Sequence, residues 1–175
     1  MNPDALDRLA ARVADRLERA YDAYEAGHIT YDELVAGAQA ILTVAADQAT
    51  GVADLALAAW LSEHRGTVVP PAGIAPRGID TAAAVAAALA VEYDVKGRLG
   101  RTGRDVALQA AQDGYIDAMR ARDVGHWQRI PSSDACQMCR DLSEAVLPAD
   151  VDPYHHAGCQ CGIRPVITDE QESIA

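Results

Sequence analysis

Residues 136–161 read CQMCRDLSEAVLPADVDPYHHAGCQC and contain all four cysteines of the chain. Cys136 and Cys139 form a CxxC pair, a spacing at which two sulfur atoms on one tight turn reach a single ion. His156, Cys159 and Cys161 follow as HxxCxC. Structural zinc sites take four tetrahedral thiolate or imidazole ligands. The pattern therefore predicts a small C-terminal module that folds around a structural Zn²⁺.

Five side chains compete for four positions around the predicted ion. His156 and Cys159 repeat the two-residue gap of the CxxC pair, which favours a set of three thiolates and one imidazole. Cys161 is an alternative to Cys159, because alternate residues of a strand point to opposite faces. A set of four cysteines without His156 also stays open. His155 lacks the repeated spacing, and we expect it beside the site or at the surface.

Other uses of these thiols fit the sequence less well. Disulfides are rare in a reducing cytoplasm, where clustered thiols more often hold metal. A catalytic deaminase zinc site needs an HxE motif and a proline before the CxxC, whereas this chain has no HxE and places Ala135 there. A Cys–His nucleophile would need an orienting acid, and none is evident. We therefore expect no catalytic residues.

Composition and charge narrow the class of protein. The chain has 175 residues, half of them hydrophobic, and no phenylalanine. Its formal net charge of −11 repels phosphate backbones, so strong nucleic-acid binding is not expected. We interpret the basic residues Lys96, Arg98, Arg101 and Arg104 as a solvated helix face. No signal-peptide core or apolar run of membrane-spanning length is expected, so the prediction is a protein without a membrane partner.

Residues 1–66 are predicted to form an antiparallel helical hairpin. Apolar residues recur at spacings of three and four from Leu6 to Tyr24, and Gly27 provides the stop. Thr30 and Glu33 match the capping box that starts a second helix. That helix is expected to run to about Gly66, with Gly51 as a candidate kink.

The proline-rich residues 67–79 are predicted to be a linker that lies along the same chain as a strap rather than on a neighbouring subunit. Residues 80–123 are predicted to be a further helical segment. An Ala-rich helix is expected to start at Asp80 or Thr81 and reach Tyr93. Three glycines, at positions 97, 100 and 103, are expected to weaken the helix before it resumes over 105–122, either as a turn or as a close helix contact.

Residues 124–175 are predicted to form the zinc-binding C-terminal module, with short strands at 127–130 and 163–167. The predicted fold is thus mainly α, with a helical hairpin, further helices and a small β-containing zinc knuckle. Residues 106, 110, 115 and 119 are the expected buried positions of the last long helix.

WQRIPSSDACQMCRDL at 127–142, followed by PYHHAGCQCGIRPVI at 153–167, resembles the C-terminal signature of phage Mu F-like head-morphogenesis proteins. The resemblance is closest to the short versions from phages of actinobacteria. The family shows an aromatic and Arg strand, a polar turn, CxxCxxL, a variable loop, HxxCxC and a Pro-Val ending. This chain departs from it at 143–145, where many relatives carry glycine, and in a shorter variable loop. The matching residues are Trp127, Arg129, Ser132 to Asp134, Cys136, Cys139, Leu142, His156, Cys159, Cys161, Pro165 and Val166.

The resemblance implies a minor structural component of the virion, associated with the portal or the major capsid protein and present in multiple copies. It implies a location in the head interior or portal region, after a period in the host cytoplasm before assembly. Family members are often called capsid maturation proteins, so a maturation protease or other small Cys or zinc hydrolase is the alternative function. A cytosolic zinc-finger adaptor that binds other proteins is the second alternative.

Overall fold

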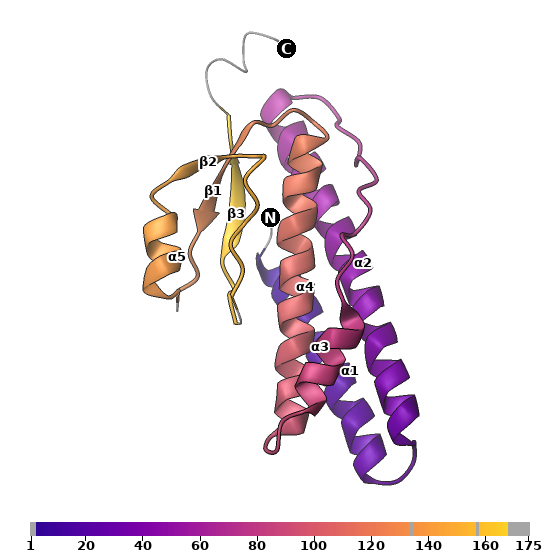
Figure 1. Cartoon of the computed structure of the whole chain (residues 1–175). Helices are drawn as coiled ribbons and strands as arrows, with labels where there is room; N and C mark the ends of the chain where they lie inside the picture. The colour runs from indigo at the N-terminus through magenta and orange to yellow at the C-terminus, as the bar shows by residue number, and fades with distance from the viewer. Residues whose placement is uncertain (1–2, 134, 157, 168–175) are drawn as a thin grey trace.

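The structure is a computed structural model and describes residues 3–133, 135–156 and 158–167. It is mainly helical, with a small antiparallel sheet near the C-terminus (Figure 1). This confirms the predicted fold class. The described elements are α1 (Pro3–Glu25), α2 (Tyr31–Arg65), α3 (Thr81–Leu89), α4 (Val95–Arg120), β1 (His126–Ile130), α5 (Gln137–Leu142), β2 (Val146–Pro148) and β3 (Gly162–Val166).

The two N-terminal helices form a hairpin, and α4 packs against both of them (Figure 1). The predicted capping box starts α2: Glu33 N–H donates to Thr30 Oγ1 at 3.3 Å, and Thr30 N–H donates to Glu33 Oε2 at 2.8 Å. α2 runs without interruption through Gly51 and ends at Gly66, whose φ of 65° suits glycine. The core between α1, α2 and α4 is built mostly from leucine and alanine.

The helix α4 begins earlier than the sequence indicated. Asp94 caps it by accepting a hydrogen bond from Gly97 N–H at 3.1 Å, so the expected interruption at the glycines is wrong. The alternative explanation, a close helix contact, holds for Gly103: a Cβ there would lie 2.6 Å from Leu17 Cδ1. The preceding helix α3 ends at Leu89, short of the predicted end. All four expected buried positions of α4 are buried, at residues 106, 110, 115 and 119.

Gly114 marks a close contact between α4 and α2. A Cβ at this position would lie 2.9 Å from the Cα of Thr50, a backbone atom that cannot move alone. Gly114→Ala should therefore force the two helices apart and lower the free energy of unfolding by about 1–3 kcal/mol. The matched change Gly51→Ala on α2 meets open space, and it should raise stability by roughly 0.5–1 kcal/mol. Urea unfolding of both variants checks this, and stabilisation by both would contradict the close packing.

Residues 67–79 lie along the helices of the same chain, as predicted for an intramolecular strap (Figure 1). Asp54 of α2 accepts hydrogen bonds from the backbone N–H of Ala72 at 3.0 Å and of Gly73 at 2.8 Å. Arg122, just after α4, pairs with Asp54 at 2.8 Å and donates to Pro70 O at 2.9 Å. The buried pair of Asp54 and Arg122 thus joins α2 to the end of α4, and hydrogen bonds to both residues hold the strap.

By length and hydropathy, α2 qualifies as a candidate membrane span, contrary to the expectation that no segment would. Its most apolar window of 18 residues has a mean hydropathy of 1.3, and 44% of that window is buried inside the protein. Leu42, Leu57 and Leu61 account for part of this hydropathy, and they face α1 and α4 as core residues. The hydropathy of α2 is therefore what a core helix of a bundle requires.

The C-terminal module contains a sheet with the strand order β2-β1-β3, both pairs antiparallel. The strands β1 and β3 lie within one residue of the predicted ranges, whereas α5 and β2 were not predicted. Trp127 lies opposite Leu147 on β2 and Pro165 on β3. Trp127 and Ile163 are buried and belong to the same core as the helices, so the sheet is fixed to the side of α4.

Candidate metal centre

Two separate segments bring the cysteines together. Cys136 stands immediately before α5 and Cys139 lies in its first turn, so the short helix presents both sulfur atoms on one side. The loop that enters β3 carries the HxxCxC residues His156, Cys159 and Cys161. Cys136 is exposed, whereas the other three thiols are buried. All five predicted ligands therefore lie in one cluster at the edge of the sheet.

Three separations in this cluster are close to those between the ligands of a tetrahedral metal centre. His156 Nε2 lies 3.4 Å from Cys136 Sγ and 3.2 Å from Cys139 Sγ. Cys139 Sγ lies 3.8 Å from Cys159 Sγ. Tetrahedral bonds of about 2.3 Å to sulfur and about 2.0 Å to nitrogen place sulfur atoms about 3.8 Å apart and nitrogen about 3.5 Å from sulfur. The described side chains thus form two overlapping groups of three potential ligands, and four of them could hold one ion after their ligand atoms move closer together.

Cys139 is shared by two groups of potential ligands. Its thiol lies within 4.8 Å of Cys136 and His156 in one group, and of Cys159 and Cys161 in the other. Both candidates for the fourth ligand, Cys159 and Cys161, thus lie near Cys139, but in a different group from Cys136 and His156. The Cys161 sulfur lies 4.0 Å from Ser132 Oγ, on the strand-side turn of the module.

The environment of the thiols differs between the two ends of the CxxC pair. A backbone hydrogen bond from Cys139 lowers the pKa of the Cys136 thiol. Burial, together with the neighbouring thiols, raises the pKa of Cys139 above its ordinary range. A buried thiol ionises only when a cation compensates its charge. Cys139 would therefore need a bound cation to ionise.

Arg129 of β1 is a buried charge beside the cluster, and the sequence pattern indicated only its place in the family signature. It is 2% exposed, Nη2 donates to Tyr154 O at 2.7 Å, and Nη1 lies 3.5 Å from Cys159 Sγ. Among the described residues it has no carboxylate partner. A buried guanidinium needs hydrogen-bond acceptors, and the Tyr154 carbonyl and the Cys159 sulfur are the ones it contacts. The alternation of the strand could have predicted the burial of Arg129, because residues 127 and 129 point to the same face.

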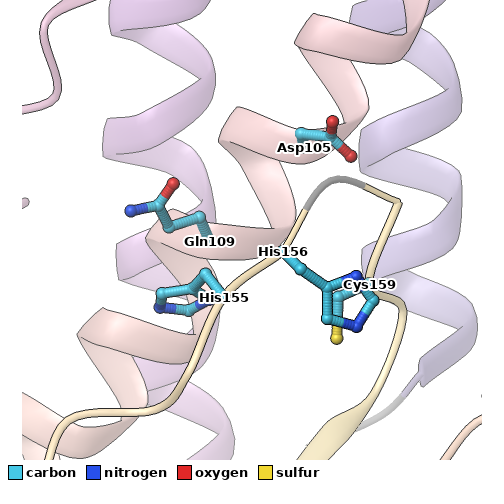
Figure 2. Close-up of a pocket in the computed structure, with 5 residues that line it drawn as sticks. All are labelled: Asp105, Gln109, His155, His156 and Cys159. Atoms are coloured by element: carbon cyan, nitrogen blue, oxygen red, sulfur yellow. The ribbon is translucent and has the colours of Figure 1, made fainter. Parts of the chain in front are cut away.

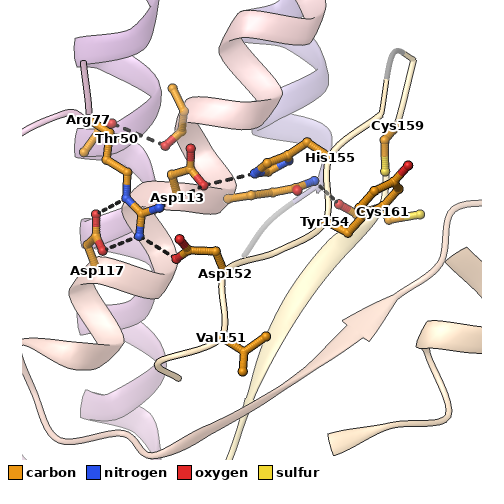
Figure 3. Close-up of polar contacts among 12 residues, drawn as sticks. Thr50, Arg77, Asp113, Asp117, Val151, Asp152, Tyr154, His155, Cys159 and Cys161 are labelled. Carbon is orange, nitrogen blue, oxygen red and sulfur yellow. Dashed lines mark hydrogen bonds and ion pairs between the residues drawn. The ribbon is translucent and has the colours of Figure 1, made fainter. Parts of the chain in front are cut away.

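His155 lies beside the cluster, as predicted, and links the module to the helices (Figure 3). Its Nε2 lies 3.0 Å from Oδ1 of the buried Asp113 on α4. Arg77 of the strap lies 3.7 Å from the same oxygen and pairs with Asp117 at 2.7 Å and Asp152 at 3.0 Å. Hydrogen bonds from Arg77 lower the pKa of both Asp117 and Asp152. This network holds the loop before His156 against α4 and the strap.

A hollow of about 260 Å³ lies next to the cluster (Figure 2). It lies between α4, which contributes Asp105 and Gln109, and the loop that carries His155, His156 and Cys159. Asp105 accepts a hydrogen bond from Gly158 N–H at 2.9 Å, which ties this loop to α4. The hollow gives water access to one side of the cluster.

Comparison with protein-family models, with curated proteins and with solved structures finds no match to this chain. The support for a metal ion in this chain therefore comes from the arrangement of its own five side chains, not from a likeness to known proteins. The resemblance to Mu F-like proteins stays a prediction from the sequence.

Proposed function

We propose that the protein is a structural, non-enzymatic head-morphogenesis protein of a phage, a minor capsid component of the Mu F-like type with a structural Zn²⁺. Two lines of support meet in the same residues. The elements that resemble the family signature are Trp127 and Arg129 of β1, the CxxC pair and the HxxCxC loop. These are also the elements that assemble the cluster and fix it to the helices.

The observation that carries the proposal is the convergence of CxxC and HxxCxC at separations of 3.2 to 3.8 Å. Three thiolates and one imidazole favour zinc over hard cations such as magnesium and calcium, which prefer oxygen. Such a centre carries a net charge of about −1, because three thiolates outweigh the divalent ion. The buried Arg129 guanidinium balances that charge.

Cys159 is the better fourth ligand of the proposed centre. Its sulfur lies at the tetrahedral separation from Cys139, and it receives the Arg129 guanidinium. Cys161 already has hydrogen-bonding neighbours of its own, since Ser132 Oγ is close to its sulfur and its carbonyl accepts from Gln112 Nε2 at 2.6 Å. The proposed ligands are therefore Cys136, Cys139, His156 and Cys159, and Cys161 supports the loop.

An assembly role suits the arrangement of the two parts. The helical body offers a rigid, elongated surface, and the zinc centre stabilises a sheet of only three short strands that has little core of its own. The proposed partners are the portal protein, the major capsid protein or both. The proposed location is the head interior or portal region of the virion, in several copies.

Co-purification from infected cells tests this function. We expect a tagged chain to be recovered with portal or major capsid protein, and the untagged chain to be present in purified virions. Recovery of the chain only as a free monomer, with none in virions, would contradict the proposal. Met138→Ser, an exposed position inside the CxxC turn, serves as the control for tagging and expression.

The hollow beside the cluster favours one rival, a zinc or cysteine hydrolase with Asp105 next to bound water. Capsid-protein cleavage by the purified chain separates the two functions. Asp105→Asn keeps an acceptor for Gly158 N–H and leaves the metal ligands intact. Cleavage by the wild type that is lost in this variant would favour the hydrolase, whereas the structural proposal expects cleavage by neither.

A further inference from the structure

A second cavity, of about 420 Å³, lies between the first half of α4 and the loop that carries the HxxCxC residues. Three arginines from successive turns of α4 line one wall. Leu108 lies further along the same helix, and the loop contributes the opposite wall. The residues that matter are Arg98, Arg101, Arg104, Leu108, Gly158 and Gln160.

The charge of this cavity is opposite to that of the chain as a whole. The chain carries a formal net charge of −11, yet three arginines at a spacing of three residues share this wall. Arg101 pairs with Asp94 at 3.0 Å. Within the described ranges, Arg98 and Arg104 form no ion pair, so two guanidinium groups remain available to an anion.

Ion pairing within the described residues does not explain Arg98 and Arg104. The first turn of α4 contains no acidic residue, although acidic side chains are the ones that stabilise a helix N-terminus. Lys96 is compensated by Asp22 at 2.7 Å, whereas Arg98, close to the first turn, has no such partner among the described residues. An external anion in the cavity would find both guanidinium groups without an ion-pair partner among the described residues.

The opposite wall depends on the metal loop. Gly158 N–H donates to Asp105 at 2.9 Å, and this bond holds the segment just before Cys159 against α4. The Asp105 carboxylate accepts this hydrogen bond, which weakens its repulsion of an anion that enters the cavity. The cavity is complete only while the HxxCxC loop is folded.

We propose that this cavity binds an acidic polypeptide segment, with neighbouring carboxylates on the arginines and an apolar side chain against Leu108. The proposal rests on a folded metal loop but not on the assignment to a phage. A nucleic acid fits less well, because the basic wall is only about 9 Å long. Acidic residues flank it, with Asp94 paired to Arg101 and Glu18 packed against Gly100, so no continuous basic track exists for a phosphate backbone.

Fluorescence anisotropy with a labelled peptide of alternating leucine and glutamate tests the site, using the zinc-loaded full chain. Replacing both cavity arginines, Arg98→Glu with Arg104→Glu, should weaken peptide binding by at least about tenfold, because two charge-assisted contacts are lost. The matched control Arg12→Glu with Arg16→Glu changes the net charge equally at exposed positions of α1 and should change affinity by less than about twofold. A leucine–glutamine peptide should bind to none of the proteins.

Zinc content and thermal unfolding of each protein accompany the titration. Glutamate at position 98 suits the helix N-terminus, so the double variant should unfold at no lower temperature than the wild type. Absence of peptide binding to the zinc-loaded wild type, or equal loss in both double variants, would overturn the site while leaving the structural function untouched. Tighter binding of a labelled 20-mer DNA duplex than of the peptide would also overturn it.

Discussion

Cys139→Ser is expected to unfold the C-terminal module while the α1–α2–α4 body stays folded. Cys139 is fully buried and lies in both groups of candidate ligands, so no other thiol can take its place. Structural zinc contributes apparent binding free energies of about 10–16 kcal/mol in small zinc modules. Trp127 and Ile163 of the sheet pack into the core of the helices, but three strands of three to five residues gain less from this packing than from such an ion. The helical body has its own leucine and alanine core.

Hydrogen exchange resolved by segment measures this outcome. In Cys139→Ser, and in the wild type treated with a chelator, amide protection should fall by orders of magnitude in β1 and β3 and persist in α2 and α4. Met138→Ser changes an exposed residue of the same turn and should preserve protection throughout. Unchanged protection of β1 and β3 in Cys139→Ser would show that the module does not depend on a metal.

Asp54→Asn should lower the free energy of unfolding by about 3–5 kcal/mol, the usual cost of leaving one partner of a buried ion pair alone. The Asp54 and Arg122 side chains are only 5% and 9% exposed and lie 2.8 Å apart. Asparagine keeps the shape but not the charge, so Arg122 would remain buried without its counter-ion. The strap would also lose the carboxylate that accepts from Ala72 and Gly73.

Urea unfolding measures the Asp54 effect, with Asp47→Asn as the matched control on the exposed side of α2. The control should change stability by less than about 0.5 kcal/mol. A loss below about 1 kcal/mol in Asp54→Asn would contradict the proposed role of this pair in holding the strap.

Acidification should remove the contribution of the Asp54–Arg122 pair to the free energy of unfolding. Burial acts to raise the pKa of Asp54, but the N–H groups of Ala72 and Gly73 and the Arg122 guanidinium outweigh it, so the folded pKa is lowered. The contribution of this carboxylate is therefore complete above its unfolded pKa of about 3.9 and is lost as pH falls through the lower folded value. The stability difference between wild type and Asp54→Asn should narrow only below about pH 4.

Local signals in the sequence were sufficient for several elements. The Thr30–Glu33 capping box and the strands around Trp127 and Ile163 depend on contacts within a few residues or on simple alternation, so they could be predicted directly. The ligand spacing likewise depends on a tight turn and a short loop. The sequence left open whether Gly103 marks a turn or a close helix contact, because the deciding neighbour, Leu17, lies on another helix.

The contacts between the C-terminal module and the helical body could not be predicted from the sequence. The pairing of His155 with Asp113 joins residues 42 positions apart, and Arg77 reaches the same carboxylate from the strap. No local pattern marks these partners. The short helix α5 and strand β2 were missed because each has so few residues that its periodicity is not visible.

The most direct test of the central claim is the zinc content of three purified proteins: the wild type, Cys159→Ser and Cys161→Ser. The wild type and Cys161→Ser should each hold one zinc ion per chain, and Cys159→Ser should lose most of it. Loss in Cys161→Ser alone would move the fourth position to Cys161 and keep the centre. Full zinc content in both variants, or none in the wild type, would contradict the proposed coordination.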